Sequence, residues 1–165
     1  MSGTIRVAAF QTAMLALLPA ALTWLRENRP RVRVEAVEAT QAEPDTSLPG
    51  LLTRDFDLVI HETFPGQARP ARASEHHLLC EEAMRPATPA DMLVHLRLVE
   101  QGHAVAFLPD LLWSDRTPGL VLDASAGHTR TVLATIRTGA GKHPLIRAVL
   151  TAIRHSLGEL PARTG

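Results

Sequence analysis

DMLVHLRLVEQGHAVAFLPD, residues 91–110, is the stretch of sequence that decides the fold. Apolar residues spaced i, i+4, i+7 begin at Met92 and predict one stripe of a helix. Gly102 follows, a residue that tolerates the positive φ found at helix C-termini. The apolar run 104–108 then stops at Pro109 and predicts a short buried strand. Because a helix, a glycine turn and a buried strand make half of an α/β unit, the stretch predicts an α/β fold.

The overall composition is that of a globular protein with balanced charge. Its 165 residues allow one domain or two small lobes. Seventeen basic and seventeen acidic residues give a formal net charge of zero, which offers no electrostatic reason for direct binding to nucleic acid. The sequence has no run of about 18 apolar residues, so it predicts no transmembrane helix. The start MSGTIRV shows no apolar export signal. We therefore expect a cytoplasmic protein with no membrane partner.

Apolar alternation in the first 60 residues predicts three strands separated by helices. The strands are expected at 5–9, 32–36 and 58–60. Thr12 is a suitable N-cap for the first helix, and Pro19 is expected to kink that helix or to divide it in two. Strand–helix–strand units of this length predict parallel pairing.

Three further elements are predicted in the rest of the chain. Residues 76–80 and 130–137 show strand-like patterns, and the second of these alternates clearly. Pro144 is expected at the first position of a final helix over 144–157. The polar segment 61–74 is predicted to be a long loop.

Residue patterns that carry common catalytic or metal chemistry are absent. The chain has eight histidines but no HExxH, CxxC or paired-histidine helix spacing, so no metal is expected. The segment 138–142, TGAGK, hints at a phosphate loop, but Ile136 stands where a glycine is needed and His143 where a Ser or Thr is needed. Glu81 and Glu82 are interpreted as solvated charges on a rim. We expect neither an enzyme nor a cofactor.

Position in the predicted sheet indicates one ligand site. Ligands bind beyond the carboxyl ends of parallel strands, where the strand order switches. The order second–first–third brings Gln11 and Thr12 near His61 and Glu62. The first helix N-terminus, the Thr12 hydroxyl and His61 would favour a small anion such as a carboxylate, with His61 acting as a second hydrogen-bond donor or as a full charge near pH 6. Glu62 is expected to point away or to pair with an arginine such as Arg69, and plain helix capping remains open for Thr12.

Five segments, in chain order, resemble the effector-binding domain of LysR-type transcriptional regulators. They are IRVAAFQTAMLALLPAAL from residue 5, RVRVEAVEA from 31, LLTRDFDLVI from 51, LRLVEQGHAVAFLPDLL from 96 and IRTGAGKHPLIRAVLTAIR from 136. The resemblance implies a periplasmic-binding-protein-like fold of type 2, in which a small effector binds between two α/β lobes. Matching family positions imply ligand contacts at Gln11, Thr12, His61, Thr88 and Pro109.

The resemblance also implies a homodimer. In the family the first-lobe helix of one copy meets the second-lobe helix of the other. This would place Leu22 and Leu25 near residues 92–99 of the partner.

The chain departs from the family pattern in two places. The helix-turn-helix that precedes this domain in the family has no counterpart here, so we expect no direct DNA contact from this chain. The second lobe is shorter than in the family. We expect a first lobe with a parallel sheet at 1–82 and 124–158, a truncated second lobe at 83–123 and a disordered tail at 159–165.

Three functions remain open at this point. The first is a ligand-sensing regulatory domain. The second is a stand-alone solute-binding module of the same fold, or a non-functional fragment. The third is an enzyme, since fold alone does not fix function, although no convergent set of titratable groups supports it. The sequence favours the regulatory domain.

Overall fold

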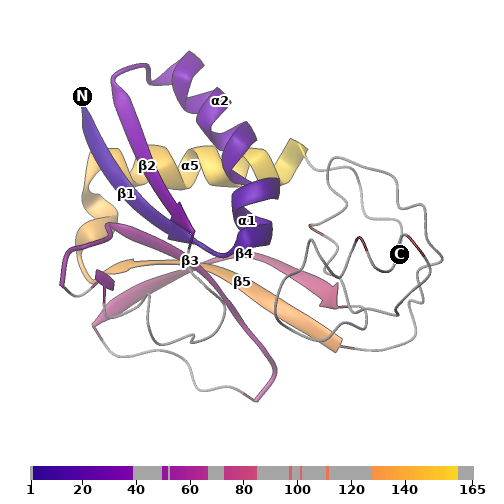
Figure 1. Ribbon diagram of the computed structural model, residues 1–165. Helices are drawn as coiled ribbons and strands as arrows, with labels where there is room; N and C mark the ends of the chain where they lie inside the picture. Colours follow the sequence, from indigo (N-terminus) through magenta and orange to yellow (C-terminus); the bar gives the residue numbers. More distant parts are fainter. Residues whose placement is uncertain are drawn as a thin grey trace.

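The computed structural model of this protein describes residues 2–38, 50–51, 53–66, 73–84, 97, 101, 111 and 128–159. These residues form one sheet with helices packed on it (Figure 1). The strands are β1 (Gly3–Ala9), β2 (Val32–Glu38), β3 (Leu58–Thr63), β4 (Ser74–Met84) and β5 (His128–Arg137). The helices are α1 (Gln11–Ala16), α2 (Leu18–Asn28) and α5 (Pro144–Glu159), with a 3-10 turn, η3 (Ala140–Lys142).

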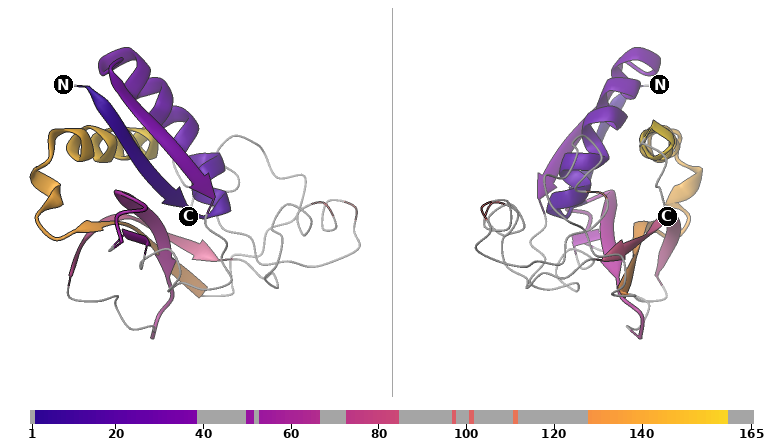
Figure 2. Two further views of the ribbon diagram at one scale, coloured as in Figure 1. Left: turned by 60° about the vertical axis from the view of Figure 1, so that its left-hand side comes forward. Right: turned by 90° about the vertical axis from the view of Figure 1, so that its right-hand side faces the viewer.

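The strand order in the sheet is β2-β1-β3-β5-β4. β1 pairs in parallel with both β2 and β3, so the predicted order second–first–third is confirmed (Figure 1). β5 lies between β3 and β4 and pairs with both in the antiparallel sense. The sheet is therefore mixed, with a parallel part where the sequence predicted one. Figure 2 shows that β4 ends and β5 begins at the same edge, as the pairing of Met84 with His128 requires.

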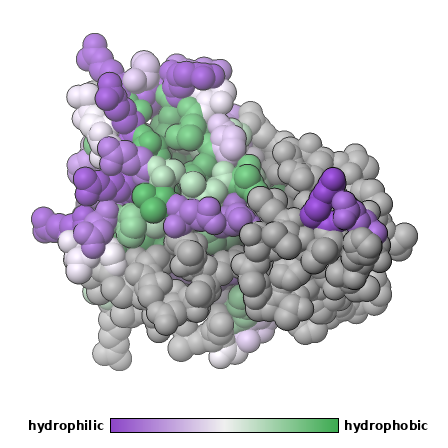
Figure 3. All heavy atoms as spheres, viewed as in Figure 1, coloured by the Kyte–Doolittle hydropathy of each residue, from purple (hydrophilic) through white to green (hydrophobic). Residues whose placement is uncertain are grey.

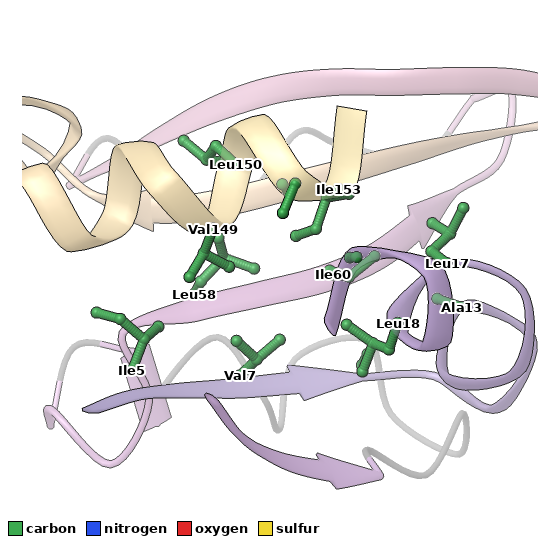
Figure 4. Close-up of a cluster of buried hydrophobic side chains, with 14 of the residues drawn as sticks. Ile5, Val7, Ala13, Leu17, Leu18, Leu58, Ile60, Val149, Leu150 and Ile153 are labelled. Atoms are coloured by element: carbon green, nitrogen blue, oxygen red, sulfur yellow. The ribbon is translucent and has the colours of Figure 1, made fainter. Parts of the chain in front are cut away.

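The main apolar core lies between the sheet and the helices α1, α2 and α5. Alternate residues of β1, β3 and β5 face the helices because strand side chains point to opposite faces in turn. In Figure 4, Val149 and Ile153 of α5 are directed toward Leu58 and Ile60 of β3. Full burial of such a side chain stabilises the fold by roughly 1.5–3 kcal/mol. The strand residues of this core are Ile5, Val7, Ala9, Val32, Leu58, Ile60, Val132, Ala134 and Ile136.

The first helical segment is divided where the sequence predicted. α1 ends at Ala16, α2 begins at Leu18, and Pro19 lies in the first turn of α2. Proline is tolerated there because the first N–H groups of a helix have no partner within the helix.

The prediction that Thr12 caps the first helix is wrong. The N-cap is Phe10, which makes no side-chain cap bond, and Thr12 lies inside the first turn. The helix starts directly after β1 because the carbonyl of Phe10 accepts the amide of Met14 at 3.0 Å. The Thr12 hydroxyl is therefore available for another role.

Several predictions fall on residues outside the described part. Of the stretch 91–110, the structure describes Arg97, which is helical, and Gln101, whose amide donates to the Arg97 carbonyl at 3.2 Å. Almost all of the predicted second lobe, 83–123, lies outside the described residues, so the division into lobes stays a prediction. The predicted loop 61–74 was too long, because β3 continues to Thr63 and β4 begins at Ser74. Within the described residues, no helix is long and apolar enough to cross a membrane.

Candidate ligand-binding site

A buried arginine lies where β3, β4, β5 and the start of α1 meet. Arg130 is 1% exposed. Its Nε donates to Oε1 of Glu82 at 2.6 Å, and its Nη2 lies 2.5 Å from the same oxygen. Nη2 also donates to the Thr12 hydroxyl at 3.0 Å, while Nη1 pairs with Oε2 of Glu62. The guanidinium carbon sits 4.9 Å from the ring centre of Phe10, within the range of a cation–π contact. We call Arg130, Glu62, Glu82 and Thr12 the Arg130 cluster.

Strand register explains why three charges converge on the core face of the sheet. Arg130 is two residues before Val132, and Glu62 is two residues after Ile60, so each continues the alternation of a buried strand face. Glu62 is the register partner of Val132, and Glu82 is the register partner of Arg130. Adjacent strands thus place the side chains of Glu62, Arg130 and Glu82 next to one another on one face.

The two carboxylates of the cluster differ in their surroundings. The Glu82 side chain is fully buried, and its Oε2 also accepts the amide of Leu111 at 2.8 Å. The Glu62 side chain is 17% exposed. Buried ions are tolerated where they are paired and hydrogen-bonded. One guanidinium against two carboxylates leaves the cluster with a formal charge of −1.

The cluster lies at the edge of the sheet where a ligand site is expected. β1, β3 and β4 all end here, and α1 begins here with the half-buried Gln11 and the buried Thr12. The strand order reverses between β1 and β3, so this edge is the switch point of the parallel part of the sheet. Polar groups at a switch point form a candidate ligand site.

Comparison with known protein families identifies the chain. A family model described as the LysR substrate binding domain matches residues 1–96, more than half of the sequence. The chain belongs to this family. The matched residues include β1 to β4, and with them Thr12, Glu62 and Glu82 of the Arg130 cluster.

Solved structures of LysR regulators share the fold. A reduced form of OxyR from N. meningitidis has a TM-score of 0.76 at 16% identity, covering 94% of this chain and 96% of that chain. An OxyR mutant from Porphyromonas gingivalis has a TM-score of 0.75 at 17% identity, covering 93% of each chain. The effector binding domain of a BenM variant has a TM-score of 0.72 at 15% identity, covering 94% of each chain. The periplasmic-binding-protein-like fold is therefore confirmed. No curated protein matches the sequence.

In this LysR substrate-binding domain, the residues predicted to bind a ligand are not all at one place. Gln11 and Thr12 lie at the start of α1, as expected. His61 lies on the opposite face of the sheet, where its Nε2 is 2.7 Å from the Thr135 hydroxyl. Nδ1 of His76 is 2.8 Å from the same hydroxyl. Because neighbouring residues in a strand face opposite sides, Glu62 rather than His61 accompanies Thr12.

The environment of His61 also changes its expected charge. Burial, and next the nearby His76, lower the pKa of His61 from 6.5 to about 4. His61 is thus neutral at pH 6, and the expectation of a cation near that pH is wrong. Its role at this position is to bond Thr135 within the sheet.

The remaining site predictions have mixed outcomes. Thr88, Pro109 and Arg69 lie outside the described residues. The arginine that pairs with Glu62 is Arg130, which no local motif indicated. Glu82 was expected to be solvated, but it is 2% exposed. Its burial follows from register, because Glu82 faces the same side as Arg130 and the two charges satisfy one another.

The described residues do not form a metal centre. No group of three or more His, Cys, Asp or Glu side chains in the described ranges could hold a metal ion. Cys80, the single cysteine of the sequence, is half-buried. The Arg130 cluster offers hydrogen bonding and ion pairing at the candidate site.

Proposed function

We propose that this chain is the ligand-sensing regulatory domain of a LysR-type transcriptional regulator, and that it binds a small effector beside the Arg130 cluster. The observation that carries the proposal is a buried ion-pair cluster at the switch point of the sheet, in a chain of this family. Clustered ionisable groups at such an edge are typical of functional sites. The homodimer implied by the family stays part of this proposal.

The composition of the cluster supports a binding role over a purely structural one. A single buried pair, Arg130 with Glu82, would already be neutral and hydrogen-bonded. Glu62 adds a second carboxylate, which is part-exposed at the edge of the sheet. An additional charge of this kind does not improve core packing, but it leaves a polar group where a ligand can reach it.

We propose a small carboxylate as the chemical class of effector. Arg130 is the support for this choice, because a planar guanidinium with five N–H donors matches the geometry of a carboxylate. α1 has six residues, so its helix dipole contributes less than the sequence suggested. Gln11, half-buried at the start of α1, is available for further hydrogen bonds to the effector.

The test compares two matched threonine variants by calorimetric titration with a panel of small carboxylates. Thr12 and Thr135 are both fully buried and hydrogen-bonded, but they lie on opposite faces of the sheet. Thr12→Val removes the acceptor that positions Nη2 of Arg130, so we expect it to weaken carboxylate binding about tenfold or more. Thr135→Val makes the same chemical change away from the site and should leave affinity unchanged. If Thr12→Val binds every ligand as the wild type does while folded, the effector site lies elsewhere.

A further inference from the structure

We infer that Glu62 is an exchangeable occupant of the effector site: the carboxylate of the effector replaces Glu62 on Nη1 of Arg130. The inference rests on the proposed function, since it concerns the same site. It adds a regulatory step, in which binding releases the carboxylate of one residue of β3 from the core face of the sheet.

The first observation is the unequal hold on the two carboxylates. Glu82 is fixed by Nε and Nη2 of Arg130 through one oxygen and by the amide of Leu111 through the other. Glu62 is held by one group among the described residues, Nη1 of Arg130. The Glu62 side chain is also the part-exposed one. Among these contacts, release of Glu62 from Arg130 breaks one charge-assisted hydrogen bond. Release of Glu82 would break its bonds to Nε and Nη2 of Arg130 and to the amide of Leu111.

The second observation is the charge of the cluster. With both glutamates in place, the cluster already carries one carboxylate more than its guanidinium neutralises. A further carboxylate added beside them would bring three negative groups around one buried cation, which a weakly screened interior opposes strongly. Exchange of Glu62 for the effector keeps the charge of the cluster unchanged. An anion can thus bind to Arg130 on condition that Glu62 withdraws.

The third observation is that Glu62 lies near the end of its strand with a side chain that already reaches solvent. Glu62 is the penultimate residue of β3, and it is followed by Phe64, which is 37% exposed, and by a turn with Gly66 at φ +88°. The Glu62 side chain is already part-exposed, so in the inferred exchange its carboxylate moves outward by rotation about its side-chain bonds. The backbone pairing of Glu62 with Val132 need not change.

The exchange makes a direct prediction about affinity, which titration of Glu62→Gln measures. Glutamine keeps the size of the side chain and a carbonyl for Arg130, but it removes the charge that competes with the effector. We expect benzoate and succinate, used as probes, to bind Glu62→Gln at least tenfold more tightly than the wild type. Glu62→Asp, whose shorter side chain reaches Arg130 less well, should shift affinity in the same direction and serves if Glu62→Gln does not fold.

Glu75→Gln is the matched control. Glu75 is on β4 of the same sheet, but its carboxylate accepts the amide of Gly139 at 2.5 Å, away from the Arg130 cluster. We expect its affinity for benzoate and succinate to equal that of the wild type.

The alternatives give different results with the same proteins. If carboxylates bind the wild type and Glu62→Gln equally, or bind the variant more weakly, exchange is wrong while the proposed site stands. If benzylamine or putrescine binds the wild type and loses affinity in Glu62→Gln, Glu62 itself contacts a cationic effector and the exchange is again wrong. If no probe binds either protein, the proposed function and the exchange both fail.

Discussion

Arg130 combines three interactions at the scale of a single residue. Its guanidinium is buried at 1% exposure, pairs with two carboxylates and donates to the Thr12 hydroxyl 118 residues away in the chain. Removing one partner of a buried ion pair is more damaging than replacing the whole pair with apolar groups, because it leaves an uncompensated charge. The fold and the proposed site therefore depend on the same side chain.

Replacing Arg130 with methionine should lower the free energy of unfolding by about 3–5 kcal/mol, since Glu82 would stay buried without its cation. Urea unfolding followed by circular dichroism measures the change. Arg6→Met is the control: Arg6 pairs with Glu35 at 3.3 Å on the surface, with side chains 59% and 61% exposed. Its loss should change stability by less than about 1 kcal/mol. Similar losses in both variants would contradict a structural role for the cluster.

The low pKa of His61 makes stability depend on pH. The folded protein binds the His61 proton near pH 4, whereas the unfolded chain binds it near 6.5. Stability from this residue is therefore complete above pH 6.5 and decreases as the pH falls toward about 4. The separation corresponds to about 3 kcal/mol at most.

Urea unfolding at intervals from pH 7 to pH 4 measures this decrease. His61→Gln should show a smaller decrease than the wild type over that range. A His61→Gln variant with the full wild-type decline would show that other groups cause it.

α2 shows at the scale of an element how a helix divides its leucines between core and surface. Leu18, Ala21 and Leu25 are spaced i, i+3, i+7 and all face the core. Leu22 is 40% exposed. The expectation that Leu22 and Leu25 both meet a partner is therefore wrong for Leu25, which is 3% exposed. Figure 3, which has the view of Figure 1, shows apolar side chains gathered on the surface over α2.

The two leucines of α2 form a matched pair for mutation. Leu25→Ala should lower the free energy of unfolding by about 2–5 kcal/mol, because it opens a cavity in the main core. Leu22→Ala should lower it by less than about 1 kcal/mol, because much of that side chain is already in water. Chemical denaturation of both variants measures the difference. Equal effects would contradict the assignment of Leu25 to the core and of Leu22 to the surface.

At the scale of the whole molecule, exposed apolar side chains remain on the helix layer. Leu15 of α1 is 46% exposed and Leu22 of α2 is 40% exposed. Exposed apolar surface on a helical face is a common site of protein association. It supports the proposed homodimer, in which these helices meet a second copy.

Sedimentation equilibrium tests the assembly. We expect the wild type to show concentration-dependent dimerisation, and Leu22→Glu to shift it at least tenfold toward monomer because a charge would be buried in the interface. Glu27→Gln, a change of the same charge magnitude at an exposed position of α2, serves as the control and should dimerise as the wild type does. A wild type that stays monomeric at all concentrations would contradict the proposal.

Among the described residues, the sequence by itself determined the main elements, their order and the edge of the sheet where the candidate ligand site lies. These follow from local signals: period-two alternation in β1, β2 and β5, the helical stripe of α5, and the break at Pro19. It did not determine the face on which each polar residue lies at that edge. His61 and Glu62 are neighbours in the chain but lie on opposite faces, and a shift of one residue in register would exchange them.

The tertiary structure alone decided the partners in the Arg130 cluster. The alternation before Val132 could have indicated that Arg130 faces the core, and the same signal was present at Glu62 after Ile60. The identity of the partners depends on β5 lying antiparallel between β3 and β4, with Arg130 opposite Glu82. Pairing between distant strands is set by the packing of the whole sheet, whereas a local pattern reports the burial of one residue. For this reason the sequence located the edge of the sheet that carries the candidate site, and the fold decided which charged side chains meet at that edge.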